Sequence, residues 1–214
     1  MDRERTHEPR KPYELAADAA VAGVIGAAIA AAGSYAFLYG LSYQFAPIPG
    51  TSINSGAGGT ITVLFFLLLA VAMSVGGGAL LSKALGVSTW QRSTLISAAA
   101  HAIGLPLWIW TDLHIVIGLH TPGSTYGFDG LVAFPAAAYA FIVPLIVLFS
   151  TFRRNAAKGL AITLPLWIGT CALAVTALLL GSEGMAVTSG VVAWVVLPAV
   201  SVLGSAMIEP RSHQ

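Results

Sequence analysis

Charged side chains are scarce in this chain of 214 residues. They make up 9% of its residues, whereas a soluble domain carries about 25%. Eight of the nineteen charged residues lie in 1–15, and only nine lie in 16–208. A soluble fold of this size would have to cover its surface with leucine, valine and alanine. This scarcity excludes a cytosolic enzyme, a nucleic-acid-binding protein and a disordered chain.

Cysteine is nearly absent, and the common catalytic motifs are missing. The single cysteine, Cys171, excludes an internal disulfide, a CxxC pair and a zinc framework, so we expect it to be a small packing residue. The chain has no HExxH, no Gly-x-Ser-x-Gly, no P-loop and no GxGxxG at the start of a helix. The motifs therefore assign no enzyme class.

Long apolar runs dominate what is present. The chain is 57% hydrophobic, with a mean hydropathy of +0.82. Crossing a bilayer takes about 20 apolar residues in a helix, and unbroken runs do not show the alternation of a membrane β-strand. Six stretches are long enough: 16–41, 60–82, 93–118, 130–151, 160–180 and 186–207. We therefore predict an all-α integral membrane protein with a six-helix transmembrane bundle in the lipid bilayer.

The basic residues predict the orientation of this bundle. In the six-span arrangement, all ten Lys and Arg fall on one side, and the loops after the first, third and fifth spans have none. Short loops rich in Lys and Arg stay cytoplasmic. We expect a multi-pass protein of the cell (plasma) membrane, with both its charged tail 1–15 and its tail 209–214 in the cytoplasm and the domain 16–208 between them. The first apolar run is too long for an ordinary signal-peptide core.

Small residues and prolines shape the predicted spans. Ala22, Gly26 and Ala30 form a small-xxx-small row on the first span, which favours close helix packing in lipid. The row fits packing within one subunit, or docking onto another membrane protein or a second copy of the chain. Prolines inside the spans are expected to kink several helices; they are Pro106, Pro135, Pro144, Pro165 and Pro198.

The third span carries several polar residues. At 100° per residue, a single helix face holds Ser97, His101, Trp108 and Asp112, together with Thr94. A polar stripe on a membrane helix faces the bundle interior or a wet cavity. These four residues are candidates for substrate binding or a proton relay. The simpler interpretation makes His101 a neutral imidazole bonded to a serine, a threonine or a backbone carbonyl.

Acidic and histidine residues gather near the predicted outer end. Asp112, His114, His120 and Asp129 could supply nitrogen and oxygen ligands to zinc or copper, although their spacing matches no strong metal signature. The acids there could otherwise be solvated, pair with an imidazolium or attract an external cation. No other cofactor is expected, because the other spans contain no histidine to hold a haem.

Two functional classes remain open beside a purely structural membrane protein. The first is a solute-handling transport component, or a non-catalytic subunit of a larger membrane complex. The second is a metal- or redox-dependent membrane enzyme subunit with a His/Asp site on the third span. A solute would be neutral, apolar or cationic, because no Lys or Arg lies within the spans or in the predicted outer loops.

The predicted orientation can be tested by cysteine labelling. In a Cys171→Ser background, single cysteines replace Ser88 in the basic loop and Ser124 in the loop after the third span. We expect a membrane-impermeant maleimide to label Ser124→Cys in intact cells and Ser88→Cys only after permeabilisation. Labelling of Ser88→Cys in intact cells would overturn the assignment of sides.

Overall fold

The computed structural model describes the backbone of residues 11–45, 56–120, 130–151 and 156–208, and in these residues it contains helices and no strand. The elements are α1 (Pro12–Phe45), α2 (Gly56–Ala84), α3 (Trp90–His120), α4 (Gly130–Thr151), α5 (Ala156–Leu180), α6 (Glu183–Val191), the π-helical turn η1 (Val192–Val196) and α7 (Leu197–Ile208). The expectation of an all-helical protein is confirmed for this part of the chain.

Within the described residues, five segments are long and apolar enough to cross a membrane. They are Pro12–Leu41, Gly59–Ala84, Trp90–Leu113, Ala161–Leu180 and Glu183–Met207, the last comprising α6, η1 and most of α7. The helix α4 has 22 residues, and its apolar part with described side chains, Tyr139–Thr151, is shorter than the others. The apolar helices fit a multi-pass membrane protein, and the count of six spans stays a prediction.

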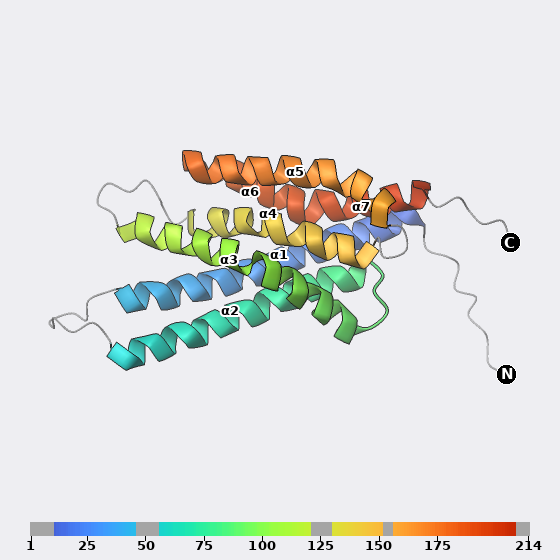
Figure 1. Ribbon diagram of the computed structural model, residues 1–214. Helices are drawn as coiled ribbons and strands as arrows, with labels where there is room; N and C mark the ends of the chain where they lie inside the picture. The colour runs from blue at the N-terminus through green and yellow to red at the C-terminus, as the bar shows by residue number, and fades with distance from the viewer. Residues whose placement is uncertain (1–10, 46–55, 121–129, 152–155, 209–214) are drawn as a thin grey trace, which may run out of the picture.

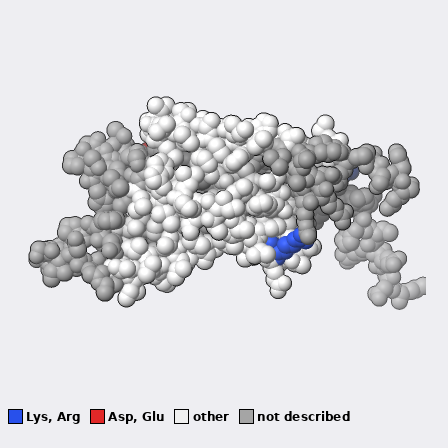
Figure 2. Space-filling view, viewed as in Figure 1, with Lys and Arg blue, Asp and Glu red and all other residues white. Residues whose placement is uncertain are grey.

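The helices form an elongated bundle with alternating directions (Figure 1). The start of α1, the turn between α2 and α3 and the end of α7 lie at one end, and the turn between α5 and α6 lies at the other. On the face seen in Figure 2, the described Lys and Arg atoms gather near the first of these ends, and the rest of the described surface is neither basic nor markedly acidic. An uncharged lateral surface is what a lipid environment requires.

The close crossing of α1 and α2 depends on glycine. A Cβ added to Gly26 would lie 2.7 Å from the carbonyl oxygen of Gly77, and one added to Gly77 would lie 2.5 Å from that of Gly26. Helices in lipid gain stability from such close backbone contact, because hydrophobic burial drives their association only weakly. The buried row Ala22, Gly26 and Ala30 therefore packs within this chain. A partner docked on α1 stays a prediction.

The last apolar segment changes its helical geometry before a proline. The Leu197 N–H donates to the carbonyl of Val192, five residues earlier, which defines the π turn. Pro198 has no N–H to offer the carbonyl of Trp194 in α-helical geometry. This carbonyl lies against α1, where a Cβ on Gly23 would be only 1.8 Å from its oxygen. The prolines at 106 and 165 lie inside continuous helices.

The turn between α5 and α6 is very short. Gly181 and Ser182 are the residues between the two helices, and Gly181 adopts a positive φ of 62° that favours glycine. The Ser182 side chain then caps α6 by accepting the backbone N–H of Met185. A glycine followed by an N-capping serine thus reverses the chain directly.

The α1–α2 crossing gives a stability prediction with a control in the same helix. Gly77→Ala should lower the free energy of unfolding by about 1–3 kcal/mol, because its methyl group would meet the α1 backbone. Gly76→Ala should be neutral or stabilising by up to about 1 kcal/mol, because its Cβ would meet nothing within 4 Å. Thermal unfolding in mild detergent measures both. Equal melting temperatures for the two variants would contradict the close crossing.

Candidate functional site

The polar face of α3 points into the bundle. Ser97 and Asp112 are wholly buried, Trp108 is also fully enclosed, and His101 is 2% exposed. Thr94, at the start of the same face, is exposed. The four candidate residues therefore occupy the interior between α1, α2 and α4, and the stripe loses its burial toward the basic end of the helix.

A serine of α1 joins two of these residues. The indole Nε1–H of Trp108 donates to the Ser34 Oγ at 2.9 Å, and the Ser34 hydroxyl donates to the two carboxyl oxygens of Asp112 at 3.3 and 3.2 Å. Trp108 and Asp112 are one helical turn apart on α3, so the hydroxyl spans both. A carboxyl group offers about four acceptor positions, and one hydroxyl leaves Asp112 with capacity for a further donor.

One ring nitrogen of His101 is hydrogen-bonded to the backbone of its own helix. Its Nδ1 lies 2.8 Å from the carbonyl oxygen of Ser97. A carbonyl only accepts, so a neutral imidazole here carries its proton on Nδ1 and leaves Nε2 as a bare acceptor. That Nε2 atom is buried with no hydrogen-bond partner among the described residues. The expectation of an imidazole bonded to a backbone carbonyl is thus confirmed, and one ring nitrogen remains unused.

The position of His101 depends on a glycine of α2. The Ser97 hydroxyl donates to the carbonyl of Val75 at 2.8 Å, which ties α3 to α2. A Cβ on Gly78 would lie 2.3 Å from the Ser97 Oγ and 3.3 Å from the His101 Cε1. The small residue at 78 therefore makes room for the histidine and its supporting serine.

Tyr139 of α4 lies at the centre of the polar and aromatic residues. Its hydroxyl makes a short hydrogen bond with the Ser74 hydroxyl of α2. Its ring lies 6.0 Å from that of His101, 6.3 Å from that of Trp108 and 5.7 Å from that of Trp194, measured between centroids. Aromatic contacts of this kind favour tilted and edge-on arrangements. Tyr139 thus lies beside two residues of the α3 stripe, His101 and Trp108.

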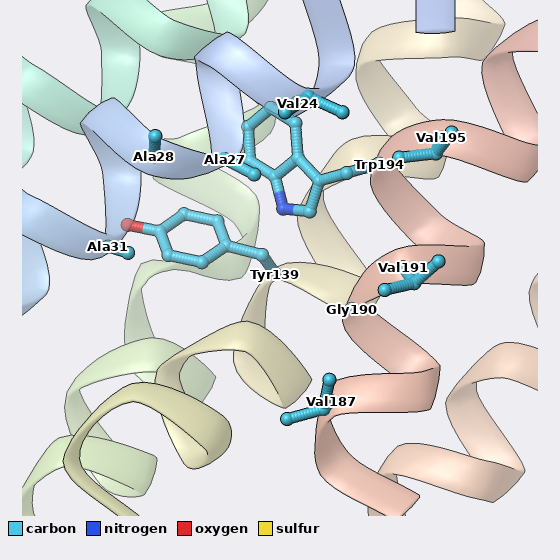
Figure 3. Close-up of a pocket in the computed structure, with 10 residues that line it drawn as sticks. All are labelled: Val24, Ala27, Ala28, Ala31, Tyr139, Val187, Gly190, Val191, Trp194 and Val195. Carbon is cyan, nitrogen blue, oxygen red and sulfur yellow. The ribbon is translucent and has the colours of Figure 1, made fainter. Parts of the chain in front are cut away.

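A pocket of about 300 Å³ adjoins this cluster. Its walls come from α1, α4 and the α6–η1 segment, and its lining is apolar except for the polar atoms of Tyr139 and Trp194 (Figure 3). The lining residues are Val24, Ala27, Ala28, Ala31, Tyr139, Val187, Gly190, Val191, Trp194 and Val195. Its volume is at the lower end of the range for small-molecule sites, about 300–1,000 Å³.

The structure brings some predicted residues together and separates others. Trp108 and Asp112 share the Ser34 hydroxyl, and the ring of Tyr139 lies beside the rings of both His101 and Trp108. The pairing of Asp112 with an imidazolium or an external cation stays a prediction. Another interpretation made Asp112 a solvated acid near the outer boundary. It is instead fully buried and bonded to a serine, because α1 covers this part of α3.

The predicted metal site falls mostly outside the described residues. The side chains of His114 and His120 and the whole of Asp129 are not described, and among the described residues no three His, Cys, Asp or Glu lie together as metal ligands. Zinc or copper binding, and with it the metal- or redox-dependent enzyme, stays a prediction. Cys171 lies within packing distance of α4, with its sulfur 3.9 Å from the carbonyl oxygen of Ala140.

Four residues of the site were missed in the sequence: Ser34, Ser74, Tyr139 and Trp194. Each is a polar or amphipathic side chain in an apolar span. A buried hydroxyl or indole usually needs a partner, which would have marked these residues as interior. No sequence signal pairs them with particular residues of α3.

Comparison with protein-family models, curated proteins and solved structures finds no match for the chain.

Removing the shared hydroxyl should weaken the interior. Ser34→Ala leaves the Trp108 N–H and the Asp112 carboxyl without their shared partner, and we expect a loss of about 1–3 kcal/mol of unfolding free energy. The control is Ser189→Ala, also buried, whose hydroxyl donates to the Ala186 carbonyl of its own helix and to no other group in the described part of the chain. Thermal unfolding in detergent compares them. If Ser34→Ala is no less stable than Ser189→Ala, the shared hydroxyl does not hold the helices together.

Proposed function

We propose that the protein is a solute-handling component of a membrane transport system, with its solute site in the pocket between α1, α4 and α6. The observation that carries this proposal is the position of Tyr139, which lines the pocket and also contacts the buried polar groups of α3. A cavity with an apolar lining and a few convergent polar groups is the usual form of a small-molecule site.

The lining favours an uncharged solute. Among the described residues, no Lys, Arg, Asp or Glu lines the pocket. An ion placed there would lose its hydration with no counter-charge from these residues to replace it. Tyr139 has its hydroxyl engaged by Ser74, so it offers the pocket mainly the face of its ring. An apolar or weakly polar molecule fits these walls best.

His101 and Asp112 are the groups of this proposal that would exchange a proton during transport. Both are ionisable residues buried inside an apolar bundle, where such residues usually mark a functional path. His101 keeps a free acceptor on Nε2, and Asp112 keeps unused acceptor positions beside Ser34. Trp108 and Ser97 are the positioning residues, since they bond to Ser34 and to the α2 backbone.

The chain would depend on another source of energy. It contains no P-loop, so transport would be driven by an ion gradient or by a partner subunit. In this proposal the protein lies in the cell membrane with both termini in the cytoplasm, and a partner would use the exposed surface of the bundle.

A co-purified solute tests the proposal. The full chain is extracted in mild detergent, and the small molecules bound to it are identified by mass spectrometry. We expect an uncharged lipophilic molecule at near-stoichiometric amounts in the wild type and a loss of at least tenfold in Ala28→Phe, whose ring would fill the pocket. The matched control is Ala72→Phe, an exposed alanine of α2 that does not line the pocket. Equal retention by Ala28→Phe and Ala72→Phe, or no bound molecule in any of them, would contradict the proposal.

A further inference from the structure

The pocket is a wedge between two helices that part from one another. In the described residues, α1 packs against η1 and α7, but it makes no close contact with α6. The separation begins at the π turn, where the carbonyl of Trp194 rests on Gly23. Beyond this point toward Glu183 the helices α1 and α6 are apart, and the pocket lies in the gap (Figure 3).

The side of the wedge is open at the lateral surface of the bundle. Three of its lining residues are about half exposed: Val24 at 55%, Val187 at 48% and Val191 at 49%. All three are apolar and belong to segments that are long enough to cross a membrane. In a bilayer, this opening faces acyl chains, so a lipophilic molecule can reach the pocket without passing through water.

The pocket contains one unused donor. The indole nitrogen of Trp194 points toward the side of Tyr139, inside the pocket (Figure 3). The described part of the chain provides no hydrogen bond for this N–H, unlike that of Trp108, which donates to Ser34. A tryptophan N–H can only donate, so a molecule that satisfies it must bring an acceptor atom.

The depth of Trp194 narrows the class of molecule. Glu183 and Met207 bound the last apolar segment, and Trp194 lies about 16 Å from the first and about 20 Å from the second along the helix. The hydrocarbon core is about 30 Å thick, which places the indole near its middle. The ester carbonyls of phospholipids lie at the interface, so a bilayer phospholipid reaches the indole only with its hydrocarbon chain.

We infer that the pocket binds an uncharged lipophilic molecule that enters sideways from the bilayer and presents a carbonyl or hydroxyl oxygen to the Trp194 Nε1–H. This inference rests on the proposed function and adds to it the route and the chemical class of the solute. The apolar body of the molecule would lie along Val187 and Val191, with its oxygen at the foot of the wedge beside Tyr139.

Two probes that differ by one oxygen test the inference. Radiolabelled 2-undecanone and undecane are equilibrated with the full-length protein in phosphatidylcholine nanodiscs, with binding to empty nanodiscs subtracted. We expect the wild type to prefer the ketone by roughly fivefold, the size of one neutral hydrogen bond. Trp194→Phe keeps an aromatic ring and removes the donor, so it should lose the preference and still bind undecane as well as the wild type.

The controls separate the inference from the function on which it rests. Ala28→Phe should lose both probes, and Ala72→Phe should retain both with the wild-type preference. If both probes bind and the ratio of ketone to undecane binding is the same in the wild type and in Trp194→Phe, the donor role of Trp194 is wrong. The pocket would still hold a solute. If Ala28→Phe binds both probes as well as the wild type, the site is elsewhere and the proposed function fails with the inference. If phosphatidylcholine occupies the pocket and neither probe binds above the level of empty nanodiscs, the pocket is a phospholipid site. That result would overturn the inference and not the proposed function.

Discussion

Polar groups in an apolar bundle have to find partners in other helices, and the Ser34 hydroxyl shows how this constraint shapes the structure. It accepts from Trp108 and donates to Asp112, so a single α1 atom satisfies two groups of α3. Without water to replace them, such bonds fix the rotation of each helix about its own axis. The burial of the α3 stripe, and therefore the position of His101 and Tyr139 beside it, follows from that rotation.

Glycines allow the helices of the same bundle to approach closely, because they have no side chain. Gly26 and Gly77 let two backbones touch, Gly78 makes space for Ser97 and His101, and Gly23 accommodates the carbonyl of Trp194. Each of these positions has no room for a Cβ, so the small residues act as contact points between helices. The interior is thereby both closely packed and supplied with polar groups.

The helical architecture could be predicted from the sequence because it depends on the length and polarity of each segment. The polar face of α3 could be predicted for the same reason, since helix geometry places Ser97, His101, Trp108 and Asp112 on one side. The groups that contact these four residues could not be predicted from the sequence. Whether Asp112 meets water, an imidazolium or a serine depends on which helix packs over it, and this contact is encoded by packing between distant segments and not by local spacing.

The two-residue connection between α5 and α6 has a consequence for how the pocket could ever close. With Gly181 and Ser182 as the whole link between α5 and α6, this connection is too short to swing across the mouth of the pocket. Within this hairpin, access would be regulated by a tilt of α6, together with α5, toward α1. The π turn at Val192–Val196 would be the hinge for this tilt. Occupancy of the pocket and the tilt of the last helix would then change together.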